Sequence, residues 1–139
     1  MKKLERFVEA QDRGYEIALR EMKAGRKQNH WIWYIFPQLK GLGYSDKAKY
    51  YGIENFDEAK DYLAHPVLGK RLIEITEVIL NLSKNDPIDL MGGQIDAKKL
   101  KSSMTLFALA SGEKVSVFHK VIEKFFGGKM DEATIKLNN

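Results

Sequence analysis

The residues best suited to chemistry fall in one block of fourteen, from His30 to Gly43, which contains both tryptophans of the chain. An indole such as that of Trp33 could stack on a base or another planar ligand, and His30 could contact that ligand or act as a general base. The same rings could instead anchor a hydrophobic core. Because tryptophans two residues apart point to different sides of a helix, we expect at most one of Trp31 and Trp33 to face a pocket.

A second unusual stretch places three hydroxyl groups within four positions, at Ser102, Ser103 and Thr105. Together with the ammonium group of Lys99, about one helical turn away, these hydroxyls could bind a phosphate or a ribose. Alternatively, each hydroxyl donates to a carbonyl four residues earlier, and Lys99 pairs with Asp96 in solvent. The pattern alone leaves both interpretations open.

Two polar side chains interrupt apolar stripes and could line the same site. The amide of Gln11 needs hydrogen-bond partners if it is buried, either in a ligand or in a loop carbonyl such as that of the Pro37-Gln38 turn. Arg71 could bind an anion bidentately, or it could pair with an acidic residue on the surface of its own helix. Both remain candidates for the polar lining of a site, with Gln38 beside them.

The other two histidines have simpler interpretations. His65 precedes Pro66, which favours a role as the cap of the following helix. His119 is followed by Lys120 on an otherwise amphipathic stretch, and we expect it to be solvated. A catalytic role for His65 is the less favoured alternative.

The formal net charge is +4, which is compatible with an anionic partner but does not require one. Two short basic clusters could contact nucleic acid: the corner of Lys23, Arg26 and Lys27, and the group of Lys98, Lys99 and Lys101. Neither is long, and no helix-turn-helix, zinc or RNA-binding signature accompanies them. Nucleic acid is therefore a possible but weakly supported partner.

Several classes of site are excluded or not expected. The chain has no cysteine, which excludes disulfides and thiolate nucleophiles, and its three histidines lack the spacing of a helical metal motif. No glycine-rich phosphate loop occurs either, so we expect neither a metal nor a cofactor. No stretch approaches the roughly 20 apolar residues that span a bilayer, and the first residues do not lead into an apolar run. We expect a cytoplasmic protein with no membrane partner.

The elements that must position these side chains read as helices almost throughout. Caps, glycines and prolines predict helices over residues 4–24, 29–36, 45–52, 55–64, 66–82, 86–92, 97–110 and 117–126, with a final turn from Asp131. The stripe of Leu68, Leu72, Ile75 and Ile79 is the densest and should be core. No segment alternates with period two. We therefore expect an all-α fold, a compact single-domain bundle of short and medium helices over residues 1–139, and a monomer or weak dimer.

Five blocks of the sequence, in this order, resemble the domain-of-unknown-function family 1810. They are Arg6-Phe7 with Ala10-Gln11, Lys27 with His30-Trp31 and Trp33, Phe36-Pro37-Gln38-Leu39 with Gly41, Tyr62-Leu63 with His65-Pro66, and Ser102-Ser103-Met104-Thr105-Leu106-Phe107. The resemblance covers essentially the whole chain and implies a compact, all-helical bacterial domain of uncharacterised function. Some relatives carry the label of calpastatin, a protease inhibitor, but such inhibitors are disordered segments that fold on their target, whereas this chain has the caps and stripes of a folded domain.

The sequence thus predicts a site where the block of residues 30–43 meets the helix of residues 102–105, with Gln11, Gln38, Arg71 and Lys99 as its polar lining. The function that this site favours is binding or processing of a small anionic or nucleotide-like ligand. The alternatives are a nucleic-acid-binding module that uses the corner at residues 23–27, and a protein-interaction module that docks a partner on the aromatic block. Whether the protein is an enzyme, and which reaction it would catalyse, the residues do not indicate.

Overall fold

The computed structural model describes residues 2–137 and confirms the all-α fold. This part of the chain contains no β-strand, only an isolated parallel bridge between Leu39 and Ile53. A 3-10 turn, Lys2–Leu4, precedes the helices α1 (Glu5–Ala24), α2 (Ile32–Ile35), α3 (Asp46–Tyr50), α4 (Phe56–Ala64), α5 (Leu68–Leu80), α6 (Pro87–Met91), α7 (Gln94–Ala110), α8 (Val117–Phe126) and α9 (Glu132–Leu137). None of the helices within residues 2–137 combines the length and apolar composition that crossing a bilayer requires.

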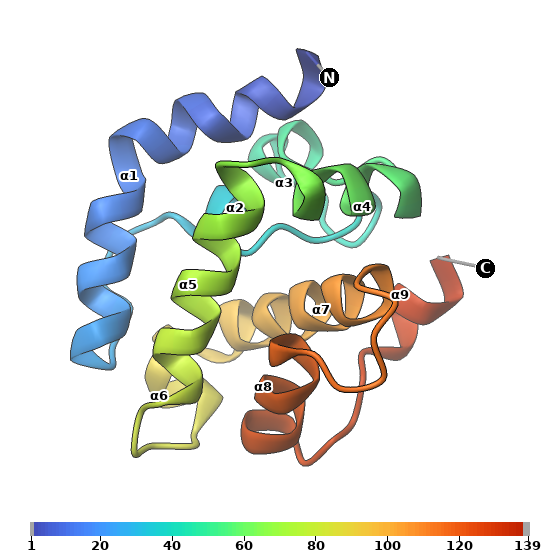
Figure 1. Ribbon diagram of the computed structural model, residues 1–139. Coiled ribbons are helices and arrows are strands. Elements are labelled where there is room, and N and C mark those ends of the chain that lie inside the picture. The colour runs from blue at the N-terminus through green and yellow to red at the C-terminus, as the bar shows by residue number, and fades with distance from the viewer. Residues whose placement is uncertain (1, 138–139) are drawn as a thin grey trace.

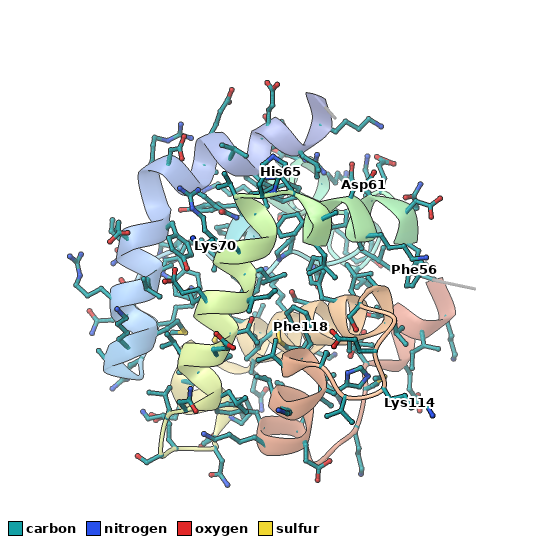
Figure 2. The ribbon with its side chains drawn as sticks, viewed as in Figure 1. Phe56, Asp61, His65, Lys70, Lys114 and Phe118 are labelled. Carbon is teal, nitrogen blue, oxygen red and sulfur yellow. The ribbon has the colours of Figure 1, made fainter. Side chains whose placement is uncertain are left out.

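Most helix ends lie where the sequence predicts them, because local side-chain bonds fix them. The side chains of Ser45, Asn55 and Asp86 accept hydrogen bonds from the first free backbone N–H groups of α3, α4 and α6. Gly25 ends α1 with a φ of 84°, in the left-handed region that a side chain disfavours. His65 caps the start of α5 as expected, since its Nδ1 accepts from the backbone N–H groups of Val67 and Leu68. Figure 2 shows it at the bend that joins α4 to α5.

Three local predictions are wrong in detail. The second helix is confined to Ile32–Ile35, and α7 begins at Gln94, three residues before the predicted start. Asp96 lies inside the first turn of α7 and forms an ion pair with Lys27 instead of capping the helix. His119 is half-buried and has a structural role: its Nδ1 accepts from the backbone N–H of Ser116, and this pair closes a capping box at the start of α8.

Helix α7 is the centre of the fold. It lies between α4 and α8 in Figure 1 and also contacts α2, α6 and α9. Every residue from Ser102 to Ala108 is buried, so this second half of the helix is enclosed on all sides rather than on one stripe, whereas the first half is partly exposed. Phe107 of α7 packs against Phe118 of α8 with ring centroids 5.9 Å apart, and Figure 2 shows Phe118 between the two helices. The predicted core stripe of α5 is confirmed, with Leu72 1% and Ile75 0% exposed.

The long first helix packs along α5 and α2 and forms one wall of the molecule. Figure 1 shows that α1 bends midway along its length. Gly14 lies near the middle of the helix, and a Cβ atom there would be 2.3 Å from the hydroxyl oxygen of Tyr34. Glycine at this position therefore lets the ring of Tyr34, from α2, lie directly against the backbone of α1.

Candidate functional site

The loop between α1 and α2 is fixed by a buried carboxylate. Glu21 is 9% exposed, and its Oε1 accepts from the backbone N–H groups of Gln28 and Asn29 and from the indole N–H of Trp31, the last at 2.9 Å. The Asn29 side-chain amide bonds its other oxygen, Oε2. Burial alone would raise the pKa of Glu21, but the four hydrogen bonds have the larger combined effect and lower it to about 2. The anchored loop turns Trp31 into the core, where it is 1% exposed, and so directs Trp33 to the other side of α2.

The same loop is tied to α7 by an ion pair. The ammonium group of Lys27 lies 2.7 Å from a carboxylate oxygen of Asp96, and the Lys27 side chain is only 6% exposed. The backbone N–H of Lys27 donates to the carbonyl of Leu90 at 2.8 Å, which fixes the loop to α6 as well. Lys27 is therefore a structural residue, and the predicted basic corner of three surface cations contains only Lys23 and Arg26.

The two unusual blocks of the sequence meet at Gln38 and Ser102. The hydroxyl of Ser102 donates to Oε1 of Gln38 at 2.6 Å, and also to the carbonyl of Lys99 on its own helix. Since this bond uses the Gln38 carbonyl oxygen, the amide N–H groups of Gln38 remain free to donate elsewhere. The side chain of Gln38 is only partly buried. This bond brings together residues that are 64 positions apart in the chain.

Two cations converge on the indole ring of Trp33. The ammonium nitrogen of Lys47, from α3, lies 4.7 Å from the ring centroid, and that of Lys99, from α7, lies 5.2 Å from it. Within residues 2–137 neither lysine forms an ion pair with a carboxylate. The aromatic ring offers partial compensation to each ammonium group. The narrow cavity between Trp33, Gln38 and Lys99 measures about 10 Å³, which is too small for any ligand.

A larger hollow of about 280 Å³ opens on the other side of Gln38 and Lys99. It lies between the loop of residues 38–42, the first half of α7 and the start of α9, and its lining residues are Gln38, Leu42, Ile95, Lys98, Lys99, Ser102, Asp131 and Ala133. The lining combines two ammonium groups, an oriented amide, one carboxylate and apolar side chains. Pockets for small ligands have this composition: mostly apolar walls with a few placed polar groups.

The structure thus brings together four of the predicted site residues, namely Trp33, Gln38, Lys99 and Ser102. The other two hydroxyls of the cluster point away from the hollow. Ser103 is 0% exposed, and its hydroxyl is buried with no hydrogen-bond partner within residues 2–137. Thr105 donates to the carbonyl of Lys101 and accepts from the backbone N–H of Asp131, so it holds the segment before α9. For Thr105 the structure shows the back-bonding alternative that the sequence left open.

Gln11 and Arg71 lie in a separate network between α1 and α5. The Gln11 amide donates to the carbonyl of Tyr34 in α2 at 2.8 Å and to the hydroxyl of Tyr62, so its partners are internal, although neither of them is in the Pro37-Gln38 turn. Arg71 lies 3.3 Å from the carboxylate of Asp12 and donates to the amide oxygen of Gln11. Neither residue lines the hollow beside Lys99. His30 does not line it either, because it faces a different hollow beyond α2.

The sequence did not single out several residues that the structure places at or near this site. Lys47 is one of two basic residues in α3, and only the fold shows that its ammonium group reaches Trp33. Ile95 lies at the rim of the hollow and is 73% exposed. In the sequence, only its position before a run of charged residues distinguishes it. Glu21 could have been found, since it continues the buried line of Gly14 and Ala18 at helical spacing. A charged residue on such a line needs internal partners.

No group of three or more histidine, aspartate or glutamate side chains that could hold a metal ion occurs within residues 2–137. The candidate site beside Lys99 has two ammonium groups and one carboxylate in its lining. Its charges suit an organic or phosphate anion better than a cation.

Comparisons with other proteins agree with the fold. No curated protein matches the chain significantly. Among solved structures, the chain is similar to the conserved hypothetical protein Rv1873 from Mycobacterium tuberculosis: the two are 42% identical, with 96% of this chain and 94% of that chain covered and a TM-score of 0.91. The match to a family description, "Protein of unknown function (DUF1810)", extends over residues 1–137, which agrees with the resemblance seen in the sequence. The chain belongs to this family.

Proposed function

We propose that the protein binds a small anionic ligand, about the size of a mononucleotide, in the hollow between the loop of residues 38–42 and α7. The observation that carries the proposal is the pair of ammonium groups of Lys98 and Lys99 beside the amide of Gln38. Within residues 2–137 neither lysine forms an ion pair, and Ser102 holds the Gln38 amide in one orientation. A preoriented donor beside two cations that form no ion pair favours an anion.

The rest of the lining supports a ligand that also has an apolar or planar part. Leu42, Ile95 and Ala133 form apolar surface at the rim, and Ile95 is largely exposed in the absence of a ligand. The carboxylate of Asp131 can accept from a ligand N–H or O–H group. A phosphate with a nucleoside-like body satisfies all three kinds of contact, and a volume of about 280 Å³ limits the ligand to a small one.

The nucleic-acid alternative receives less support from this geometry. It depended on the corner of Lys23, Arg26 and Lys27, but Lys27 is buried and paired with Asp96. Two neighbouring surface cations are too few for the several phosphate contacts that such a surface makes.

Binding is tested by isothermal titration calorimetry with phosphate, adenosine and adenosine 5′-monophosphate. We expect the nucleotide to bind more tightly than either part alone, and Lys99→Gln to weaken nucleotide binding about ten-fold, as removal of one charge-assisted hydrogen bond does. Binding should also change the fluorescence of Trp33, because the ring lies beside Lys99. The variant Trp33→Phe should lose this signal while Trp31 remains as background.

The matched control is Lys70→Gln. It removes a positive charge of the same kind from the exposed face of α5 (Figure 2), and Lys70 lines neither hollow. It should bind the nucleotide as the wild type does. Equal weakening in both variants would show a general charge effect and would contradict the proposed site. Binding of oligonucleotides with a steep salt dependence, but of no small anion, would favour the nucleic-acid alternative.

A further inference from the structure

A second hollow lies between α1, α3 and the segment that carries His30 and Tyr34. It measures about 270 Å³. The side chains that matter for its chemistry are Arg13 from α1, His30 and Tyr34 from the second helix and the loop before it, and Lys47 and Tyr51 from α3 and its end. Ala10 and Ile17 of α1 complete the lining with apolar surface. The hollow is thus built by three segments that are distant in the sequence.

The charges in this hollow are all of one sign. Arg13 and Lys47 supply two positive charges beside the imidazole of His30, and none of the described residues that line it is an aspartate or glutamate. Neither Arg13 nor Lys47 forms an ion pair within residues 2–137. A concave surface that is lined by cations and by no carboxylate has a positive potential, and that potential attracts anions. In the hollow beside Lys99, by contrast, Asp131 offsets part of the charge.

Two phenol groups add neutral hydrogen-bond donors. The ring centroids of Tyr34 and Tyr51 lie 5.6 Å apart. The ring of Tyr34 lies against α1, because Gly14 has no side chain to displace it. Burial raises the pKa of both phenols, more than the charge of Arg13 lowers it, so they remain protonated at neutral pH. A protonated phenol can donate a hydrogen bond to an anion without any charge of its own.

We propose that this hollow is a second anion site, which binds the phosphate group of a small phosphomonoester through Arg13, Lys47, His30 and the phenol of Tyr34 or Tyr51. Several donors arranged around one concave surface suit a phosphate, which presents three terminal oxygens, better than a carboxylate with two. A phosphate occupies only part of the volume. The remaining space, beside Ala10 and Ile17, accepts the organic group attached to it.

This inference does not depend on the site beside Lys99. Only Lys47 is near both, since it lines this hollow and its ammonium group also lies over the ring of Trp33. Arg13 does not line the hollow beside Lys99, so a variant at Arg13 distinguishes the two sites experimentally. A change at Arg13 tests the second site alone, and a change at Lys99 tests the first.

The experiment is calorimetric titration of the protein with phenyl phosphate, in the wild type and in the variants Arg13→Gln, Arg20→Gln and Lys99→Gln. Arg13 and Arg20 are both exposed arginines of α1, but Arg20 lines none of the hollows described here, so it controls for net charge. We expect Arg13→Gln to weaken binding by about ten-fold or more. Arg20→Gln and Lys99→Gln should leave phenyl phosphate bound in the second hollow with unchanged affinity. Acetate should not compete at equal concentration.

Four results would overturn the inference or its assignment of the ligand. The first is the absence of phenyl phosphate binding in the wild type. The second is equal weakening in the two arginine variants, which would reflect net charge. The third is loss of binding in Lys99→Gln but not in Arg13→Gln, which would place the phosphate in the other hollow. The fourth is competition by acetate that is as strong as competition by inorganic phosphate at the same concentration. That result would overturn the assignment of the ligand as a phosphate.

Discussion

Lys27 and Asp96 form an ion pair that joins the loop before α2 to the first turn of α7, with 2.7 Å between the ammonium nitrogen and the carboxylate oxygen. The side chains are 6% and 23% exposed, so the pair is largely removed from water. Lys27 also lies 5.2 Å from the ring centroid of Trp31. The pair therefore sets the position of the aromatic block relative to the helix that carries Lys99 and Ser102.

Replacing Asp96 with asparagine should destabilise the protein by about 3 kcal/mol, because it leaves the Lys27 charge buried without a partner. Urea unfolding followed by circular dichroism measures this loss. The exposed pair of Lys40 and Glu54, with side chains 48% and 38% exposed, is the matched control. Glu54→Gln should cost less than about 1 kcal/mol. Similar losses in the two variants would mean that burial does not determine the strength of the Lys27 pair.

The low pKa of Glu21 predicts a specific dependence of stability on pH. Because folding lowers this pKa from 4.5 to about 2, the carboxylate contributes its full stabilisation above pH 4.5 and loses it as the pH falls toward 2. The contribution is about 3 kcal/mol. Glu21→Gln should be less stable than the wild type at pH 7, and the difference in unfolding free energy should shrink at pH 3. A difference of the same size at both pH values would contradict this account.

Gly14→Ala should destabilise the protein, although alanine is favoured over glycine in a helix by about 1 kcal/mol. The new methyl group would lie 2.3 Å from the hydroxyl oxygen of Tyr34, so the ring or the helix must move. In thermal unfolding, the double variant Gly14→Ala with Tyr34→Phe should recover part of the loss, because it removes the closest atom. A gain in melting temperature for Gly14→Ala alone would show that Tyr34 moves aside freely.

The α5 stripe offers a direct test of the core. Ile75 is 0% exposed, and truncation to alanine should cost about 2–5 kcal/mol in unfolding free energy. Ile73 lies on the same helix but is 40% exposed, so Ile73→Ala should cost well under about 1 kcal/mol. Denaturant titration of the two variants compares one side chain in two environments. A small loss at Ile75 would mean that the helix does not pack as the structure shows.

The helix ends could be predicted because each depends on residues a few positions apart. Ser45, Asn55 and Asp86 cap their helices through side chains that reach only three residues along the chain or fewer. The start of α7 was predicted at the wrong residue because Asp96 has a partner 69 positions away, in Lys27. No local pattern shows such a partner. The same reason explains the wrong prediction for Lys27, which looked like a surface cation.

Part of the candidate site was predictable for a similar reason. Two blocks with unusual composition suggested a common location, and the bond from Ser102 to Gln38 joins them. Which of the adjacent hydroxyls would face that hollow depends on how α7 is enclosed. Ser103 is turned into the core, while Ser102, one position earlier, reaches Gln38. Arg71 donates a hydrogen bond to Gln11, and Gln11 donates one to α2. The spacing of residues within their own helices could not indicate these partners.

The enclosure of α7 by five other helices has a consequence for hydrogen exchange. Backbone amides in a helical segment that is covered on every side exchange with solvent only when much of the protein opens, so residues 102–108 of α7 should exchange among the slowest. Ser102 therefore belongs to a well-protected segment, and Lys99 lies one turn before it on the same helix. Across the hollow, Gln38 and Leu42 belong to a loop. A ligand between them would slow exchange in the loop and leave the protection of α7 unchanged.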